Sequence, residues 1–170
     1  MTKLYFRADS ACYEQSVLRW LADEHRADGP QGPIGFTISA DMTAELQQAC
    51  SEVPEDHWKL VDERADETVC YADIEFTPGT WPKHAAPLRY VAVRIKKRQG
   101  LLFASGYEQK MLAVVSNRVD MPADQLLRWH WQKAGTIEQV HDVSKIRTVR
   151  SPARWTQYSE NHEDGRRPPQ

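Results

Sequence analysis

The sequence predicts an α/β protein in which a block of antiparallel strands is inserted into a layer of alternating strands and helices. Two observations lead to this prediction. Apolar runs alternate with helical spacing over residues 4–50. Residues 58–117 are instead rich in Val, Ile, Tyr, Phe and Thr, which favour strands. Alternating β and α elements favour an α/β layer, and 170 residues suit one domain.

The first elements follow from the apolar pattern and from a loop rich in Gly and Pro at residues 27–33. The first strand ends at Asp9, and Thr43 begins the second helix. We expect a strand at 4–8, a helix at 10–25, a strand at 34–39 and a helix at 43–50.

The β-rich block and the later helices follow from turn residues and capping patterns. The insertion covers about residues 55–117, and Pro122 suits the first turn of the next helix. Thr136 and Gln139 have the spacing of a capping box. We expect strands at 58–61, 68–77, 88–97 and 111–116, helices from 122 and over 136–145, a domain at 1–150 and a polar, disordered tail at 151–170.

Composition excludes several classes of protein. No apolar run approaches the roughly 20 residues of a transmembrane helix, and the first residues lack the apolar stretch of a signal peptide. The three cysteines contain no CxxC pair, which argues against a zinc site and fits a reducing cytoplasm. Because the net charge is −2, nucleic acid would have to bind to a local basic patch.

Asp9 at a strand end and Glu138 in the first turn of a helix form a candidate metal site. Two Mg²⁺ ions neutralise the attacking and leaving oxygens when a phosphodiester is cut, and carboxylates hold such ions. Lys145, seven residues after Glu138, is placed to meet a phosphate. Spacing alone favours a helix cap for Asp9 and a favourable helix dipole for Glu138 over a metal site.

Two stretches resemble the DDE-type transposases of bacterial insertion sequences, which have a ribonuclease-H-like catalytic core with a β-rich insertion. They are YFRADSACYEQSVLRWL, around Asp9, and LLRWHWQKAGTIEQVHDVSK, around Glu138. ISADMTAELQQA and MLAVVSNRVDMPADQLL resemble segments between them. The resemblance implies a partial ribonuclease-H-like core, Asp9 and Glu138 as the second and third catalytic acids, Mg²⁺ or Mn²⁺ as cofactor, and Lys145 as a DNA contact.

The chain departs from the family pattern in ways that bear on activity. Residues 1–8 contain no acid, so the first catalytic Asp is missing, and the family's basic position four residues before Glu138 is Ala134, with Lys133 beside it. The 170 residues therefore predict an inactive fragment, truncated at both ends, of a protein that cuts and joins DNA. A non-catalytic remnant that binds DNA or full-length transposase is the alternative, and a relic without function is a third.

Basic residues concentrate in the β-rich block, among them Lys96, Lys97 and Arg98. The resemblance suggests that they follow the phosphates of the terminal inverted repeats, although lysines on an edge strand also prevent edge-to-edge pairing. The expected partners are DNA, a second copy of the chain or full-length transposase. The expected location is the bacterial cytoplasm, at the nucleoid when DNA is bound.

Overall fold

The structure is a computed structural model that describes residues 4–98 and 107–132. Within these residues the chain forms six strands, three α-helices and two short 3-10 turns. In chain order they are β1 (Leu4–Ala8), η1 (Ser10–Cys12), α1 (Gln15–Ala22), β2 (Ile34–Ser39), α2 (Ala44–Ser51), η2 (Glu55–His57), β3 (Lys59–Glu63), β4 (Glu67–Ile74), β5 (Arg89–Arg98), β6 (Tyr107–Ser116) and α3 (Ala123–Trp131).

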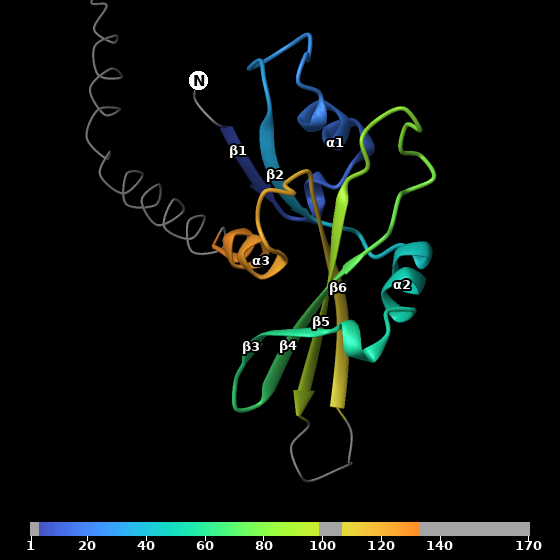
Figure 1. The fold of residues 1–170 in the computed structure, drawn as a ribbon, viewed down its shortest axis with the longest axis vertical. Helices are drawn as coiled ribbons and strands as arrows, with labels where there is room; N and C mark the ends of the chain where they lie inside the picture. Colours follow the sequence, from blue (N-terminus) through green and yellow to red (C-terminus); the bar gives the residue numbers. More distant parts are fainter. Residues whose placement is uncertain (1–3, 99–106, 133–170) are drawn as a thin grey trace, which may run out of the picture. The chain divides into compact units, whose positions relative to one another are not determined.

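The strands of the described residues form one mixed sheet in the order β1-β2-β6-β5-β4-β3 (Figure 1). β1 and β2 are parallel, with Phe6 opposite Phe36, and α1 connects them. The remaining neighbours are antiparallel, including β2 and β6, where Ile38 lies opposite Val115. The predicted α/β class is therefore confirmed, and the β-rich block continues the sheet that β1 and β2 begin.

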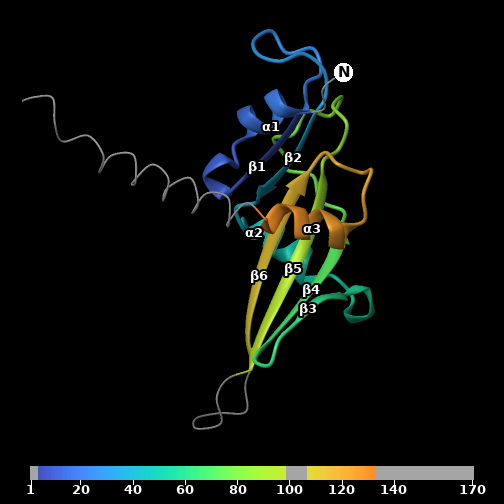
Figure 2. The same ribbon diagram turned by 90° about the vertical axis from the view of Figure 1, so that its left-hand side faces the viewer.

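Helices cover both faces of this sheet. Figure 2 shows α3 lying across one face, in front of β5 and β6, whereas α1 and α2 lie on the other side. The alternation along β5 explains how one strand serves both layers. Tyr90 and Ala92 belong to the core under α1 and α2, and Val91 and Val93 belong to the core under α3.

Helix α1 is shorter than the helix expected over residues 10–25. Ser10–Cys12 form a separate 3-10 turn, and Glu14 is extended (φ −122°, ψ 142°), so the α-helix begins only after it. At the other end, the buried guanidinium of Arg26 donates to backbone carbonyls in the last turn of α1. Those hydrogen bonds satisfy carbonyls that a further helical turn would otherwise use.

The other helices begin as the sequence predicts. The Thr43 side chain accepts a hydrogen bond from the Leu46 backbone N–H at 3.3 Å and so caps α2. Pro122 immediately precedes α3, whose Leu126 and Leu127 are fully buried. The helix expected at 136–145 and the tail at 151–170 lie outside the described residues.

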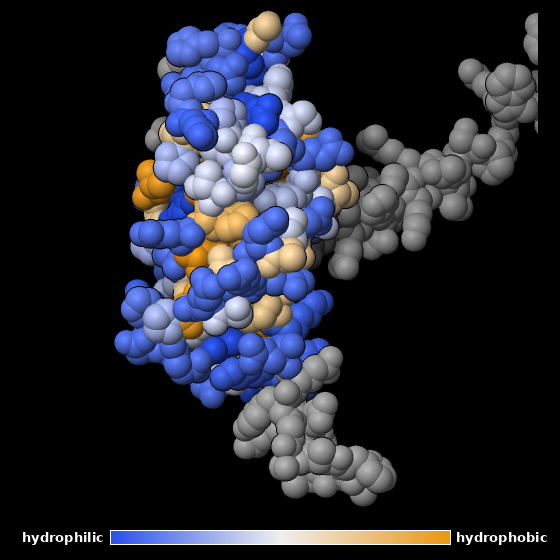
Figure 3. All heavy atoms as spheres, turned by 90° about the vertical axis from the view of Figure 1, so that its right-hand side faces the viewer, coloured by the Kyte–Doolittle hydropathy of each residue, from blue (hydrophilic) through white to orange (hydrophobic). Residues whose placement is uncertain are grey.

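Figure 3 shows the side of the molecule that carries α2. Hydrophilic residues cover its two ends, and apolar residues gather between them. In the part of the chain that the structure describes, no helix has both the length and the apolar character needed to cross a membrane.

Candidate functional site

Asp9 lies directly after β1, at the carboxyl end of the parallel pair β1 and β2. Its backbone is extended (φ −83°, ψ 178°), and the residue is exposed. The Asp9 carboxylate makes no capping hydrogen bond to the 3-10 turn that follows. Open α/β sheets bind ligands at the carboxyl ends of their parallel strands. The predicted position of Asp9 at a strand end is confirmed, while its catalytic role stays a prediction.

A depression of about 340 Å³ opens beside Asp9, on the face of the sheet that α3 covers. Apolar strand side chains such as Val93 and Leu112 line it, together with Trp131 from the C-terminal end of α3 and polar residues from the β3–β4 hairpin. Its volume is within the range of small-molecule sites, and its lining has the usual mixture of apolar surface and a few polar groups. The depression can therefore hold a small ligand beside the Asp9 carboxylate.

The His130 side chain joins the C-terminal half of α3 to β2 through two hydrogen bonds. Its Nε2 lies 3.0 Å from the Ser39 Oγ, and its Nδ1 lies 2.9 Å from the Thr37 Oγ1. The His130 side chain is buried, as is Thr37. Because a hydroxyl can donate or accept, these two hydrogen bonds suit either tautomer of the imidazole. They hold the end of α3 at the depression that Asp9 also lines.

The charged residues that the β3–β4 hairpin places at this depression have partners close by. The Arg64 Nε lies 3.1 Å from the Asp62 Oδ2, and the Lys97 Nζ lies 3.7 Å from the Glu67 Oε2. Most of these side chains are substantially exposed, and exposed ion pairs contribute only about 0–1 kcal/mol. A charged ligand can therefore replace one partner of such an ion pair at a small cost in free energy.

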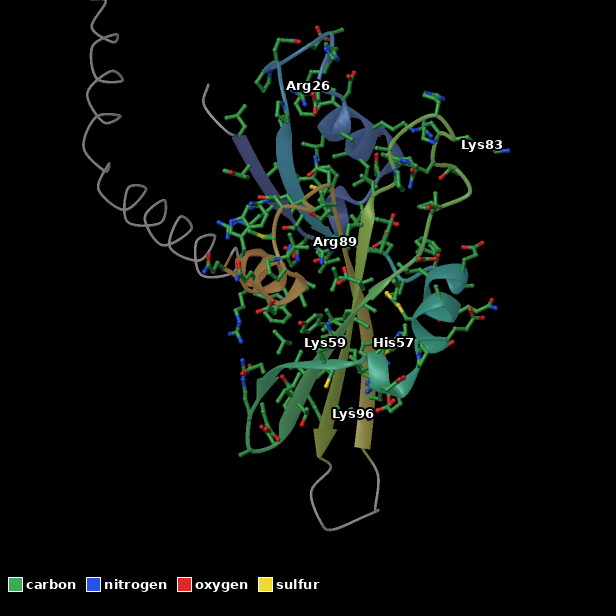
Figure 4. All side chains as sticks on the ribbon, in the orientation of Figure 1. Arg26, His57, Lys59, Lys83, Arg89 and Lys96 are labelled. Atoms are coloured by element: carbon green, nitrogen blue, oxygen red, sulfur yellow. The ribbon has the colours of Figure 1, made fainter. Side chains whose placement is uncertain are left out.

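The structure separates Lys96 from Lys97, which the sequence grouped as DNA contacts. Successive side chains of a strand point to opposite faces, and here Lys96 faces η2, where its Nζ lies 3.5 Å from the Glu55 Oε1. Lys97 faces the side of α3 and pairs with Glu67. Figure 4 shows Lys96 near one end of β5 and Lys83 on the loop beyond its other end. These lysines do not form a single basic patch.

Other predicted site residues lie outside what the structure describes. The backbone of Arg98 pairs with Tyr107, but its side chain is outside the described part. The same holds for all of Lys133, Glu138 and Lys145. Their roles in binding metal or DNA remain predictions.

Two features of the site were not singled out from the sequence. One is His130, whose partners in β2 are 91 and 93 residues away. The other is a stack in which Tyr5 and Arg7, close to Asp9 on the chain, meet the distant residues Arg118 and Trp129. Alternation along β1 was the available signal, since it places positions 5, 7 and 9 on one face. Their stacking partners, Arg118 and Trp129, come from distant segments, so no local pattern in the sequence predicts these contacts.

In the described ranges 4–98 and 107–132, no three His, Cys, Asp or Glu side chains converge closely enough to hold a metal ion. Asp9 offers a carboxylate oxygen, the kind of ligand that Mg²⁺ prefers. Comparisons of the chain with protein-family models, curated proteins and solved structures gave no match.

Proposed function

We propose that this chain is a transposase-family protein with a partial ribonuclease-H-like core. In this proposal the carboxyl edge of β1 takes part in metal-dependent cleavage and transfer of DNA strands at the ends of an insertion sequence. One observation carries it: Asp9 stands at the end of the parallel β1–α1–β2 unit, in a depression that the end of α3 also lines. The segment after α3 contains Glu138, the third acid in the resemblance.

The proposed chemistry needs several carboxylates around Mg²⁺, with Mn²⁺ as an alternative ion. Bound metal would neutralise charge on the attacking and leaving oxygens of the phosphodiester. Asp9 would supply one ligand oxygen and Glu138 another, the latter by resemblance alone. Two carboxylates are a poor substitute for three around two ions, so we expect the 170-residue chain to cut no DNA by itself.

A titration with Mn²⁺, followed by electron paramagnetic resonance of the free ion, tests the role of Asp9. The wild-type chain should bind Mn²⁺, and Asp9→Asn should weaken that binding at least about tenfold because a charged ligand is lost. Asp62→Asn is the matched control, since Asp62 lines the same depression and should affect binding little. Equal affinities for wild type and Asp9→Asn, or no binding by wild type, would contradict the proposal.

A non-catalytic DNA-binding or transposase-interacting remnant is the second candidate. It needs cations for DNA phosphates rather than a metal site, and Lys97 on β5 is such a cation, with a side chain that is 59% exposed. For this candidate, salt-sensitive binding to the DNA on either side of the gene should survive both Asp9→Ala and Glu138→Ala, with no effect of Mn²⁺. No binding at low salt would eliminate it.

A further inference from the structure

Four side chains from three segments form a continuous stack on the α3 side of the sheet. The Arg7 guanidinium lies 5.1 Å from the centre of the Trp129 ring, and the Arg118 guanidinium lies 5.0 Å from it. Arg118 also lies 4.8 Å from the centre of the Tyr5 ring. Tyr5 and Trp129 meet edge to face at 5.8 Å. Arginine over an aromatic face is a favourable cation–π arrangement.

The two guanidiniums of the stack differ in charge compensation. The Arg118 side chain is 12% exposed, and its Nη2 lies 2.7 Å from the Asp120 Oδ2. Arg7 donates from Nη1 to the Trp129 carbonyl oxygen at 2.7 Å, and none of the described carboxylates forms an ion pair with it. No described carboxylate thus balances the charge of Arg7, and a guanidinium that uses one N–H group has further donors for a ligand.

Tyr5 is the most exposed side chain of the stack. It is 52% exposed, although it is a large aromatic residue. Its ring lies against Gly35, the residue opposite it in β2, where an added Cβ would meet the ring at 2.9 Å. Glycine at this position makes room for the ring to lie close to the sheet. An exposed, supported ring is a surface on which a base can stack.

The stack leads toward the candidate site. Tyr5 and Arg7 point to the same face of β1 and contact the same tryptophan, and Asp9 continues that row at the end of the strand. Alternate residues of a strand are about 6.6 Å apart. An aromatic ring, a cation and a candidate metal ligand therefore follow one another along a single track.

We propose that this track binds an unpaired DNA strand, with a base stacked on Tyr5 and a phosphate at Arg7, and directs that strand to Asp9. The last part rests on the proposed function, whereas binding by Tyr5 and Arg7 needs no metal. Stacking on aromatic rings combined with cations along the backbone is how proteins bind single strands without sequence preference. A duplex keeps its bases stacked on each other, so it should bind this track more weakly.

Fluorescence anisotropy without divalent metal tests the track. The probe is a labelled oligothymidylate of about 20 nucleotides, longer than the roughly 4–16 nucleotides that such sites cover. Tyr5→Ala should weaken binding about fivefold or more, and Tyr5→Phe, which keeps the ring, should bind like wild type. Log affinity falls as log salt rises, and Arg7→Gln should make this negative slope shallower by about 0.7, the value for one phosphate on a single strand.

Lys83→Gln is the matched control, because it removes an exposed cation from a loop away from β1 (Figure 4). It should leave both affinity and salt slope close to wild type. Thermal unfolding of each variant shows whether the fold is kept, and the salt slope of Arg7→Gln still tests the track if Tyr5→Ala unfolds. Equal binding by wild type, Tyr5→Ala and Arg7→Gln, or tighter binding of a duplex of the same length, would overturn the inference.

The two proposals fail separately. The Mn²⁺ titration compares wild type with Asp9→Asn, whereas the anisotropy measurement without metal compares wild type with Tyr5→Ala and Arg7→Gln. Loss of the Mn²⁺ effect together with unchanged binding by Tyr5→Ala would therefore refute the track and keep the metal site. The reverse pattern would refute the metal site and keep the track.

Discussion

At the scale of single residues, the site depends on a buried polar contact that joins α3 to β2. His130 engages Thr37 and Ser39 with both ring nitrogens. Sequence reasoning placed Asp9 correctly because a strand end is a local pattern. It could not predict the hydrogen bonds of His130, since a lone histidine in an amphipathic helix carries no sign of hydroxyl partners on a distant strand. Buried polar groups with all partners present specify one arrangement of the elements that they join.

We expect His130→Leu to lower the free energy of unfolding by about 2 kcal/mol or more, because the buried Thr37 hydroxyl loses its partner. Adding Thr37→Val removes that orphaned hydroxyl. The double variant should then be more stable, by about 1 kcal/mol, than the sum of the two single losses predicts. Urea unfolding of the four proteins measures this coupling, and strictly additive losses would show that the imidazole and the hydroxyl do not interact.

At the scale of elements, ion pairs tie the turn η2 to strand β5. The Arg94 side chain is 8% exposed and binds both carboxylate oxygens of Glu55, at 2.6 and 2.7 Å. Its guanidinium also lies 4.3 Å from the centre of a Trp58 ring. The sequence located β5 within a residue or so, but it gave no sign that Arg94 is buried, unlike other basic residues of the strand. Which basic residues of a strand are buried depends on what packs against each face.

The Glu55–Arg94 pair should make stability depend on pH. Hydrogen bonds from Arg94, and the charges of Arg94 and Lys96, hold the pKa of Glu55 below its usual value of 4.5. A carboxyl whose pKa is lowered by folding stabilises the protein above the unfolded-state pKa, and this stabilisation is lost as pH falls through the folded-state pKa. Glu55→Gln should therefore be less stable than wild type near neutral pH, with a difference that shrinks well below pH 4.5.

Urea unfolding at a series of pH values measures that difference. Asp56→Asn is the control, because it removes a neighbouring exposed acid for which no ion pair is described and should change the pH profile little. A gap between wild type and Glu55→Gln that stays constant down to acidic pH would show that the pair does not contribute through ionisation of Glu55.

At the scale of the whole described molecule, one mixed sheet with helices on both faces creates the candidate site. The parallel pair β1 and β2 brings two strand ends together, and α3 returns to the same edge after the long antiparallel block. Local patterns predicted most of these elements. Local patterns could not predict that β2 pairs with β6, more than seventy residues away, because this pairing depends on which apolar faces meet during packing.

The claim that Asp9 holds a metal ion at a DNA-binding site is tested most directly by DNA binding in the presence and absence of Mn²⁺, with DNA from the ends of the element. The ligand is duplex DNA from either side of the gene, measured with the 170-residue chain at constant ionic strength. Bound metal offsets the repulsion between the Asp9 carboxylate and a phosphate, so Mn²⁺ should raise the affinity of wild type. Asp9→Asn, which lacks that charge, should bind at least as tightly as wild type without metal and gain nothing from it. An equal gain in both proteins would contradict the assignment of Asp9 as a metal ligand at a DNA-binding site.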